Sequence, residues 1–179
     1  MPRTPITIRQ AGVEDHQRIA ALGRQTFVDS FAADNRPEDM ATYLEKAFSP
    51  SIQAAELAAP SSRFLIAETG GIPVGYARLV EISAPPCIQA KKPIQLARLY
   101  ARKAWIGSGV GAALMTACID EATGWECDGI WLGVWGRNAR AIRFYHKWGF
   151  VQMGTQPFVL GNDRQTDLIL WLPLNQPPQ

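Results

Sequence analysis

The sequence contains few of the residues that form metal sites or disulfides. Three cysteines and two histidines occur among its 179 residues, and Cys87, Cys118 and Cys127 form no C-x-x-C pair. Because scattered cysteines in odd number give neither a disulfide framework nor a metal-ligand spacing, we expect a reducing, cytoplasmic environment and no metal.

Long apolar runs and internal repeats are also missing. The longest stretch without charge, residues 104–119, contains three glycines and a serine. It is shorter than the roughly 20 residues that a membrane span needs. The opening residues, Met1 to Pro5, lack the apolar core of a signal peptide. We therefore expect neither a membrane partner nor secretion.

Charge is sparse but unevenly distributed. Charged residues make up 19% and apolar residues 47%, which excludes disorder, and the net charge of +2 is too small to indicate nucleic-acid binding. Residues 14–45 carry seven acids and three bases, whereas residues 91–103 and 137–147 carry five and four bases and no acid. The basic stretches can flank a polyanionic small molecule and the acidic stretch can attract a cationic one, although solvated helix faces give the same pattern.

Hydrophobic periodicity predicts one mixed α/β domain over residues 1–173 and a flexible tail at 174–179. Alternating or continuous apolar residues predict strands, and apolar residues three and four apart predict helices. The expected order is a strand at 6–9, helices at 15–31, 37–48 and 52–58, strands at 64–68, 74–80 and 94–101, a helix at 107–123, a strand at 129–135, a helix at 138–148, and strands at 151–160 and 165–172.

The most informative segment joins the strand at 94–101 to the helix that follows it. Gly107, Gly109 and Gly111 alternate with other residues at this junction. Without Cβ atoms a ligand can approach the backbone closely, and the unpaired N–H groups at a helix start bind phosphate oxygens with help from the helix dipole. The turn therefore predicts a pyrophosphate site, while tight strand–helix packing explains such glycines as well.

A nicotinamide dinucleotide is one pyrophosphate to consider, because Gly107-x-Gly109-x-x-Ala112 fits the relaxed dinucleotide pattern. That fold requires an acidic residue at the end of the next strand to hold the ribose. Here residues 134–138 end the next strand without an acid, and the motif lies past the middle of a chain too short for two mononucleotide halves. The dinucleotide interpretation therefore fails on both counts.

A second motif makes a family resemblance specific. Gly107-Ser108-Gly109-Val110-Gly111 together with Asn138-x-x-Ala141-Ile142-x-Phe144-Tyr145-x-Lys147-x-Gly149-Phe150 resembles the GNAT acetyltransferases, which bind acetyl-CoA. Scattered residues at 26–44, residues 131–135 and Gln165-Thr166-Asp167 are similar to the PaiA-type polyamine N-acetyltransferases within that superfamily. The resemblance extends from around Ile6 to Leu172.

The resemblance implies a single mixed, mostly antiparallel sheet that is splayed at its centre, with flanking helices and with pantetheine in the cleft. It implies that the end of one central strand pairs with the pantetheine, that the glycine turn takes the pyrophosphate, and that two residues of the last helix contact the cofactor. The cofactor-binding residues that it implies are Leu99, Tyr100, Ala101, Ile106, Gly107, Ser108, Gly109, Val110, Gly111, Ala112, Asn138 and Lys147.

Tyr145 matches the general acid of the family. An amine attacks the thioester carbonyl, a fixed backbone N–H stabilises the oxyanion, and a tyrosine can protonate the departing thiolate as the carbon–sulfur bond breaks. From spacing alone, a core aromatic beside Phe144 and Trp148 explains Tyr145 equally well.

The general base stays unassigned. Many members of the family carry Glu on the central strand, where this chain has Gln95 and Ala97. The family also commonly has Arg or Gln where Ile106 stands, so one side-chain donor to the pyrophosphate is lost. The PaiA-type proteins commonly have an acid at the position of Gly136. The substitutes for the base, which the sequence does not rank, are Glu81, Asp167 or a water chain.

The acceptor site is predicted from aromatic residues beside the acidic N-terminal helices. Phe27, Phe31 and Tyr43 can line an amine pocket through apolar and cation–π contacts, and a plain core role fits them as well. The sequence therefore predicts an acetyl-CoA-dependent N-acetyltransferase acting on a primary amine of a small cationic acceptor. A polyamine, an amino-terminal peptide and an amino-acid-like amine are the candidate acceptors, and a homodimer is left open. A non-catalytic acyl-CoA-binding module of the same fold is the main alternative, and a nicotinamide oxidoreductase is a weaker one.

Overall fold

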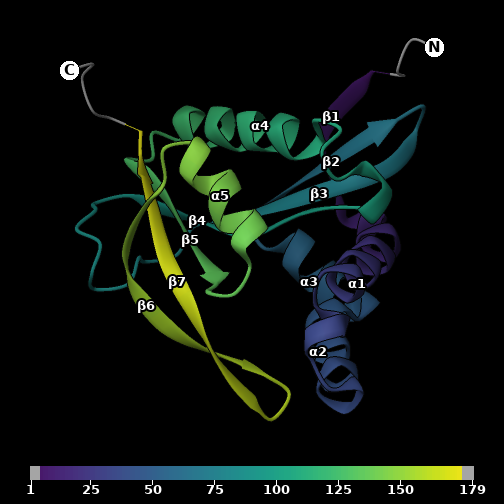
Figure 1. Cartoon of the computed structure of the whole chain (residues 1–179). Helices are drawn as coiled ribbons and strands as arrows, with labels where there is room; N and C mark the ends of the chain where they lie inside the picture. Colours follow the sequence, from purple (N-terminus) through teal and green to yellow (C-terminus); the bar gives the residue numbers. More distant parts are fainter. Residues whose placement is uncertain (1–4, 175–179) are drawn as a thin grey trace.

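The computed structural model describes residues 5–174 and contains one seven-stranded sheet flanked by helices (Figure 1). Its strands run in the order β1-β2-β3-β4-β5-β7-β6, and each neighbouring pair is antiparallel except β4 with β5. The mixed, mostly antiparallel sheet expected from the sequence is confirmed. The strands are β1 (Ile6–Gln10), β2 (Ser62–Thr69), β3 (Ile72–Val80), β4 (Pro93–Ala101), β5 (Gly129–Trp135), β6 (Val151–Leu160) and β7 (Asp163–Pro173).

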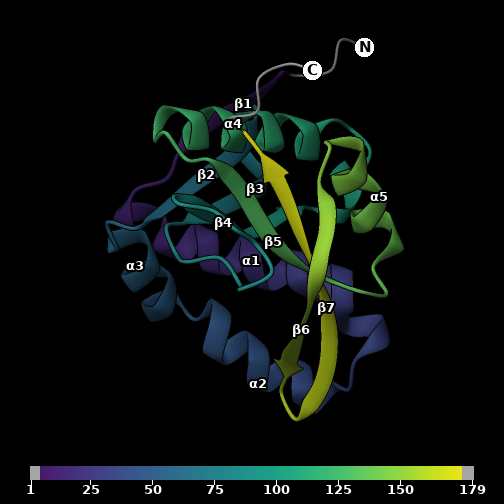
Figure 2. The ribbon, with the colours of Figure 1, turned by 90° about the vertical axis from the view of Figure 1, so that its left-hand side faces the viewer.

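Helices cover both faces of the sheet, with α4 and α5 on one side and α1 on the other (Figures 1 and 2). Helices α1, α2 and α3 follow one another without an intervening strand. The helices are α1 (His16–Phe31), α2 (Pro37–Phe48), α3 (Pro50–Ala58), α4 (Val110–Gly124) and α5 (Ala139–Lys147), with short 3-10 turns at Val13–Asp15, Ala32–Asp34 and Lys103–Trp105.

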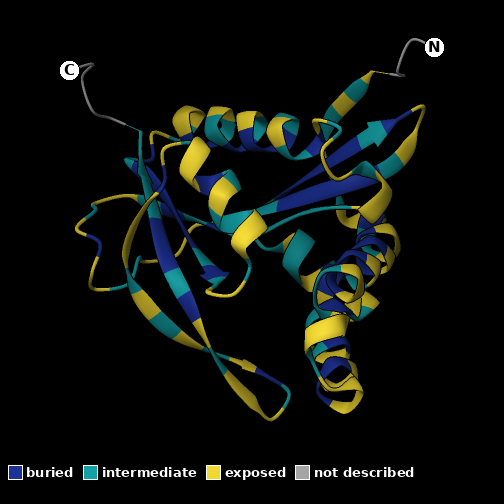
Figure 3. Ribbon diagram, in the orientation of Figure 1, coloured by how far each residue is buried: buried dark blue, intermediate teal, exposed yellow. Residues whose placement is uncertain are grey.

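Strand β2 explains why both faces are covered. Successive side chains of a strand point to opposite faces of the sheet. Leu65 and Ala67 join the core beneath α4, which includes Leu114, whereas Phe64 and Ile66 pack on the other face against α1. Figure 3 shows buried residues along the central strands and exposed residues on the outer sides of the helices.

Strands β4 and β5 pair only at their beginnings. Their parallel register ends with Gln95 opposite Trp131. Beyond this point β4 still pairs with β3 as far as Ala101, and β5 still pairs with β7 as far as Trp135. The two strands therefore diverge, and the backbone groups on their facing edges have no ladder partner in the sheet. This confirms the splayed sheet that the family resemblance implies.

Helix α4 begins three residues later than the sequence predicts. The expected start was Gly107, but the helix begins at Val110. Gly107 and Gly109 have φ values of 79° and 97°, which a right-handed helix excludes. The prediction for the end of α5 is confirmed, because Gly149 follows the helix with a left-handed φ of 91°.

Smaller differences occur at other element ends. Helix α3 begins at Pro50 rather than at 52, and the two hairpin turns contain only residues 70–71 and 161–162. Leu174, the first residue of the predicted tail, donates its N–H to the carbonyl oxygen of Asp128 at 3.0 Å. The rest of that predicted tail, residues 175–179, lies outside the described residues.

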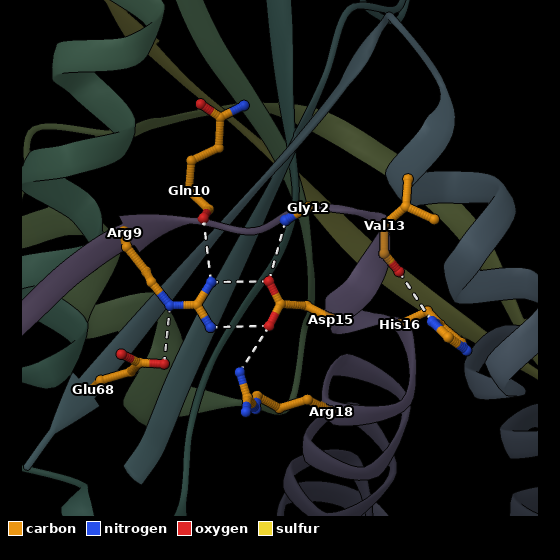
Figure 4. Close-up of polar contacts among 8 residues, drawn as sticks. All are labelled: Arg9, Gln10, Gly12, Val13, Asp15, His16, Arg18 and Glu68. Carbon is orange, nitrogen blue, oxygen red and sulfur yellow. Dashed lines mark hydrogen bonds and ion pairs between the residues drawn. The ribbon is translucent and has the colours of Figure 1, made fainter. Parts of the chain in front are cut away.

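A polar cluster fixes β1 to the start of α1 (Figure 4). The Asp15 carboxylate accepts hydrogen bonds from both terminal nitrogens of Arg9 at 2.8 and 2.9 Å, from Arg18 at 2.8 Å and from the Gly12 N–H at 3.1 Å. Arg9 Nε also donates to Glu68 of β2 at 3.0 Å. Hydrogen bonding to Arg9 lowers the pKa of Asp15 to about 2 despite the burial of the carboxylate. This cluster, which we call the Asp15 cluster, is part of the framework.

Candidate active site

A cleft of about 640 Å³ opens where β4 and β5 diverge. Figure 1 shows these strands between the α1–α2 helices and the β6–β7 hairpin, and residues of all these elements contribute to the walls. The predicted site residues that line the cleft are Phe27, Phe31, Tyr43, Leu99, Tyr100, Ala101, Ile106, Gly107, Gly109, Gly111, Ala112, Asn138, Tyr145 and Lys147.

One part of the cleft is the turn before α4. The first intrahelical hydrogen bond of α4 is donated by Ala113 to the Gly109 carbonyl, so the N–H groups of residues 110–112 precede the helical ladder. These donors and the positive end of the helix dipole suit phosphate oxygens. A Cβ at Gly107 would meet no atom within 4 Å. Packing therefore does not require this glycine, but its left-handed backbone does.

Ser108 and Val110 are predicted cofactor residues that do not line the cleft. The Ser108 hydroxyl and N–H both donate to the Trp105 carbonyl, at 2.6 and 3.2 Å, so both donors are used inside the turn. The Val110 side chain is fully buried in the core beneath α4. Because its side chain is buried, Val110 can contribute to ligand binding only through its backbone N–H.

Helix α5 adds positive charge to the cleft. Arg140, Arg143 and Lys147 all line it, because residues three and seven positions apart share one face of a helix. Only Lys147 was predicted as a site residue, although the spacing of the basic stretch contains the signal for all three. Asn138 caps α5 by accepting a hydrogen bond from the Ala141 N–H at 3.1 Å, which leaves its amide N–H groups for a ligand.

The other basic stretch is used largely within the fold. Arg98 lines the cleft, but its guanidinium donates to Glu56 at 2.6 and 3.1 Å and lies over the Phe48 ring. The Lys92 ammonium donates to the Trp125 carbonyl. Of the two basic stretches, residues 137–147 therefore contribute three bases to the cleft wall, whereas residues 91–103 contribute only Arg98, which is paired with Glu56.

Tyr145 packs in the core and also reaches the cleft wall. Its ring packs against Phe144 and Phe150 at centroid distances of 5.4 and 5.5 Å, and the residue also lines the cleft. Burial raises the pKa of the Tyr145 phenol above its ordinary value. The hydroxyl therefore holds its proton at neutral pH, as a general acid requires.

Aromatic rings line another part of the cleft, which we call the aromatic end. Phe27 lies 4.5 Å from Phe31 and 4.6 Å from Tyr43, measured between ring centroids. Phe31 also meets Trp135 at 6.1 Å, and Tyr43 meets Phe158 at 5.5 Å. The rings come from α1, α2, β5 and β6, and Trp135 and Phe158 were not among the predicted substrate residues. Their spacing along the sequence carries no signal for this association.

One carboxylate lies in the same cleft. Asp167 of β7 is 8% exposed, and burial raises its pKa to about 6. Among residues 5–174, no acid of the 14–45 stretch lines the cleft, so the expected attraction of a cation by that stretch is not seen there. Glu81, another substitute for the general base, is exposed in the loop after β3 and is not part of the cleft wall.

The α1–α2 region and the β6–β7 hairpin are joined beside the aromatic end. The Asn162 N–H donates to the buried Asp39 carboxylate at 2.8 Å, and Gln165 Nε2 donates to Asn35 Oδ1 at 2.6 Å. Leu160 of the hairpin is buried with residues of α1 and α2. We call these contacts the clasp, because they connect elements far apart in sequence on two sides of the cleft.

Two kinds of structure are not found in the described part of the chain. No three His, Cys, Asp or Glu side chains within residues 5–174 are grouped so that they can hold a metal ion. None of the helices in that range has both the length and the apolar character needed to cross a membrane. The three cysteines form no disulfide within residues 5–174, and Cys118 and Cys127 are buried.

Comparison with known proteins identifies the family. The sequence profile of the Acetyltransferase (GNAT) family matches residues 25–150. An uncharacterized N-acetyltransferase of Lactobacillus delbrueckii subsp. lactis is 35% identical over 167 residues, covering 93% of this chain and 96% of that protein. An uncharacterized N-acetyltransferase of Mycobacterium tuberculosis strain H37Rv is 32% identical over 156 residues, covering 87% of this chain and 96% of that protein.

Solved structures share the fold at low sequence identity. PaiA N-acetyltransferase from Thermoplasma acidophilum, in complex with coenzyme A, has a TM-score of 0.77 and 18% identity, covering 94% of this chain and 99% of that one. The yncA protein of Salmonella typhimurium, with its cofactor acetyl-CoA, has a TM-score of 0.67 and 23% identity, covering 98% and 97%. The chain belongs to the Acetyltransferase (GNAT) family, the acetyl-CoA-dependent N-acetyltransferases that the two spaced motifs predicted.

Proposed function

We propose that this N-acetyltransferase transfers the acetyl group of acetyl-CoA directly to a primary amine of a small cationic acceptor. The observation that carries the proposal is one continuous cleft that includes the turn before α4, the diverging ends of β4 and β5, and the aromatic end with Asp167. Two substrates held in one cleft can react without a covalent enzyme intermediate, because binding supplies their proximity and orientation.

The donor is proposed to bind along β4, the turn and α5. The unpaired edge of residues 99–101 suits pantetheine as an added strand, and the N–H groups of residues 110–112 suit the pyrophosphate. Asn138 and the basic side chains of α5 supply polar contacts to the same ligand. Because Ile106 offers no side-chain donor, backbone groups and α5 carry this binding.

The clasp supports a small acceptor. Hydrogen bonds between the α1–α2 region and the β6–β7 hairpin hold the walls of the aromatic end together, which disfavours a long polypeptide there. The resemblance to PaiA-type enzymes makes spermidine the first acceptor to test. A peptide N-terminus is the natural comparison, because the N-alpha-acetyltransferase RimI of Mycobacterium tuberculosis is 27% identical over 150 residues.

The experiment is thiol release from acetyl-CoA with a panel of acceptors at neutral pH. The panel contains spermidine, simple alkyl and aralkyl monoamines, amino acids and a short peptide. We expect release well above background hydrolysis for at least one small primary amine and slower release with the peptide. A protein that is stabilised by CoA in a thermal-shift assay but releases no thiol with any amine would be a binding module, and the proposal would be wrong.

Tyr145 is proposed as the general acid that protonates the leaving sulfur. We expect Tyr145→Phe to lower kcat by about 100-fold or more, since positioned proton transfer contributes on that scale. CoA affinity should not change, because the ring and its packing are kept. Tyr76→Phe is the matched control, as Tyr76 is a buried phenol that does not line the cleft. Equal turnover in the two variants would remove Tyr145 from this role.

A further inference from the structure

Asp167 differs from the other buried acids of the described chain. Asp15 and Asp39 are 3% and 6% exposed, and their carboxylates accept hydrogen bonds within the fold. The Asp167 carboxylate is 8% exposed, but within residues 5–174 it accepts no hydrogen bond and forms no ion pair. A buried charge without a partner costs free energy, so this carboxylate has a binding capacity that the fold does not use.

The position of Asp167 is set by strand register and by a glycine. Asp167 pairs with Trp135 on β5 and with Gln156 on β6, so these side chains share the face that lines the cleft. A Cβ at Gly133 would lie 3.1 Å from Asp167 Oδ2 and 2.7 Å from Gln156 Nε2. The missing side chain therefore leaves room for the carboxylate above β5, beyond the point where β5 has parted from β4.

The surroundings of Asp167 suit an organic cation. Among the described residues that line the cleft it is the only acid, and the aromatic end offers ring faces that attract ammonium groups. Arg98 of β4 is held by Glu56 at 2.6 Å rather than by Asp167, although Glu56 also pairs with Arg78 and so offsets only part of the charge of the two arginines. The other titratable or charged groups of the cleft are Tyr43 on α2, Tyr100 on β4, and Arg140, Arg143, Tyr145 and Lys147 on α5.

We propose that Asp167 binds the ammonium group of the acceptor and accepts its proton, so that it is the general base of the transfer. This inference rests on the proposed function, and it identifies Asp167 as the negative charge of the acceptor site. An alkylammonium with a pKa of about 10.4 is almost wholly protonated at neutral pH and has no lone pair for attack. A carboxylate that lines the cleft removes the proton where the amine is bound.

The proton balance is complete with Asp167 and Tyr145. The ammonium gives one proton to Asp167, and the freed nitrogen lone pair attacks the acetyl carbonyl carbon. As the carbon–nitrogen bond forms and the carbon–sulfur bond breaks, the sulfur leaves with the electron pair and takes a proton from Tyr145. Tyr145 regains a proton from the new amide nitrogen, and Asp167 releases its proton to solvent. One proton is released for each acetyl group transferred.

The test is the pH dependence of kcat/KM for the best amine of the panel, in the wild type and in Asp167→Asn. We expect the variant to lose about 100-fold or more near neutral pH. The wild-type kcat/KM should level off above the pKa of its base, whereas that of the variant should keep rising about tenfold per pH unit with the fraction of neutral amine. A purely structural role would lower both curves without changing their shape.

Two further measurements separate the possible outcomes. Glu81→Gln is the matched control, because Glu81 is exposed outside the cleft wall, and it should keep the wild-type profile. Without acetyl-CoA, the amine should stabilise the wild type in a thermal-shift assay and stabilise Asp167→Asn much less. If the wild type turns over amines and Asp167→Asn has the same profile and rate, this inference is wrong and the proposed function stands. If the wild type acetylates no amine, the proposed function itself is wrong.

Discussion

Asp15 and Asp167 are both almost inaccessible to solvent, yet their pKa values move in opposite directions. The pKa of Asp15 is lowered to about 2, because Arg9 and Arg18 donate to its carboxylate. The pKa of Asp167 is raised to about 6, because burial acts on it without a cation to offset it. Burial alone therefore says little about the charge of a carboxylate, and the partners decide it.

The difference separates framework from site. The Asp15 cluster has its charges paired before any ligand arrives, as suits a group that holds β1 on α1 (Figure 4). Asp167 has no hydrogen-bond or ion-pair partner among residues 5–174, and it lines a cleft with aromatic walls. Perturbed ionisable groups in clefts concentrate at functional sites for this reason. Each of the following changes tests one side of the comparison.

The largest effect on stability is expected for Asp15→Asn. The substitution removes the buried charged acceptor of Arg9, Arg18 and the Gly12 N–H, while Arg9 keeps Glu68 as an ionic partner. Because several charge-assisted hydrogen bonds are lost together, we expect a loss of roughly 3 kcal/mol in the free energy of unfolding at neutral pH. Because the pKa of Asp15 is lowered in the folded protein, its ionised carboxylate stabilises the fold at pH values above 3.8, the pKa in the unfolded chain. This stability is lost as the pH falls through about 2. The difference in the free energy of unfolding between wild type and Asp15→Asn should therefore become smaller at acidic pH, as measured by urea unfolding. A stability difference that does not change with pH would contradict the pairing of Asp15 with Arg9 and Arg18.

We expect Asp167→Asn to have the opposite effect on stability and to raise the free energy of unfolding. Ionising a carboxyl whose pKa rises from 3.8 to about 6 costs stability as pH increases through that range. Removing the charge should raise the free energy of unfolding above pH 7 by at most roughly 3 kcal/mol, and should change it little near pH 4. Urea unfolding at the two pH values checks this. A variant that is less stable than wild type at high pH would show that Asp167 is a framework residue like Asp15.

The smallest effect is expected for substitutions of the glycines in the turn before α4. Here we compare Gly109, where the backbone conformation opposes a side chain, with Gly111, where a Cβ can be accommodated. Ala at Gly109 must adopt a φ near 97°, which costs about 1 kcal/mol and disturbs the turn. Gly111 is not among the glycines with positive φ, and a Cβ there would lie 3.5 Å from Phe144, an ordinary contact. We expect Gly109→Ala to weaken CoA binding several-fold more than Gly111→Ala, as measured by calorimetry. Equal affinities would mean that the left-handed turn is not needed for binding.

Local features of the site were predictable from the sequence. Three alternating glycines after a central strand predict the phosphate turn, and the spacing of Asn138, Tyr145 and Lys147 on one helix predicts the second wall. All three of those residues line the cleft. Such features are readable because they depend on the local backbone and on the period of a single helix.

Other parts of the site were not predictable. Asp167 was one of several unranked candidates for the base, and Trp135 and Phe158 were not predicted at all as substrate residues. The clasp between Asp39 and Asn162 joins residues 123 positions apart. No local period encodes such contacts, because they depend on which strand pairs with which and in what register.

The sequence by itself determined the family, the order of the elements and the glycine turn before α4, because these follow from motif spacing and from the periods of helix and strand. Only the tertiary structure decided which acid enters the cleft. The seven acids of residues 14–45 outnumber Asp167, but none of them lines the cleft, while the β5–β7–β6 register and the missing side chain of Gly133 place Asp167 there. The effect of a charged side chain depends on its distance from other charges and on its removal from water. Both are set by packing rather than by position along the chain.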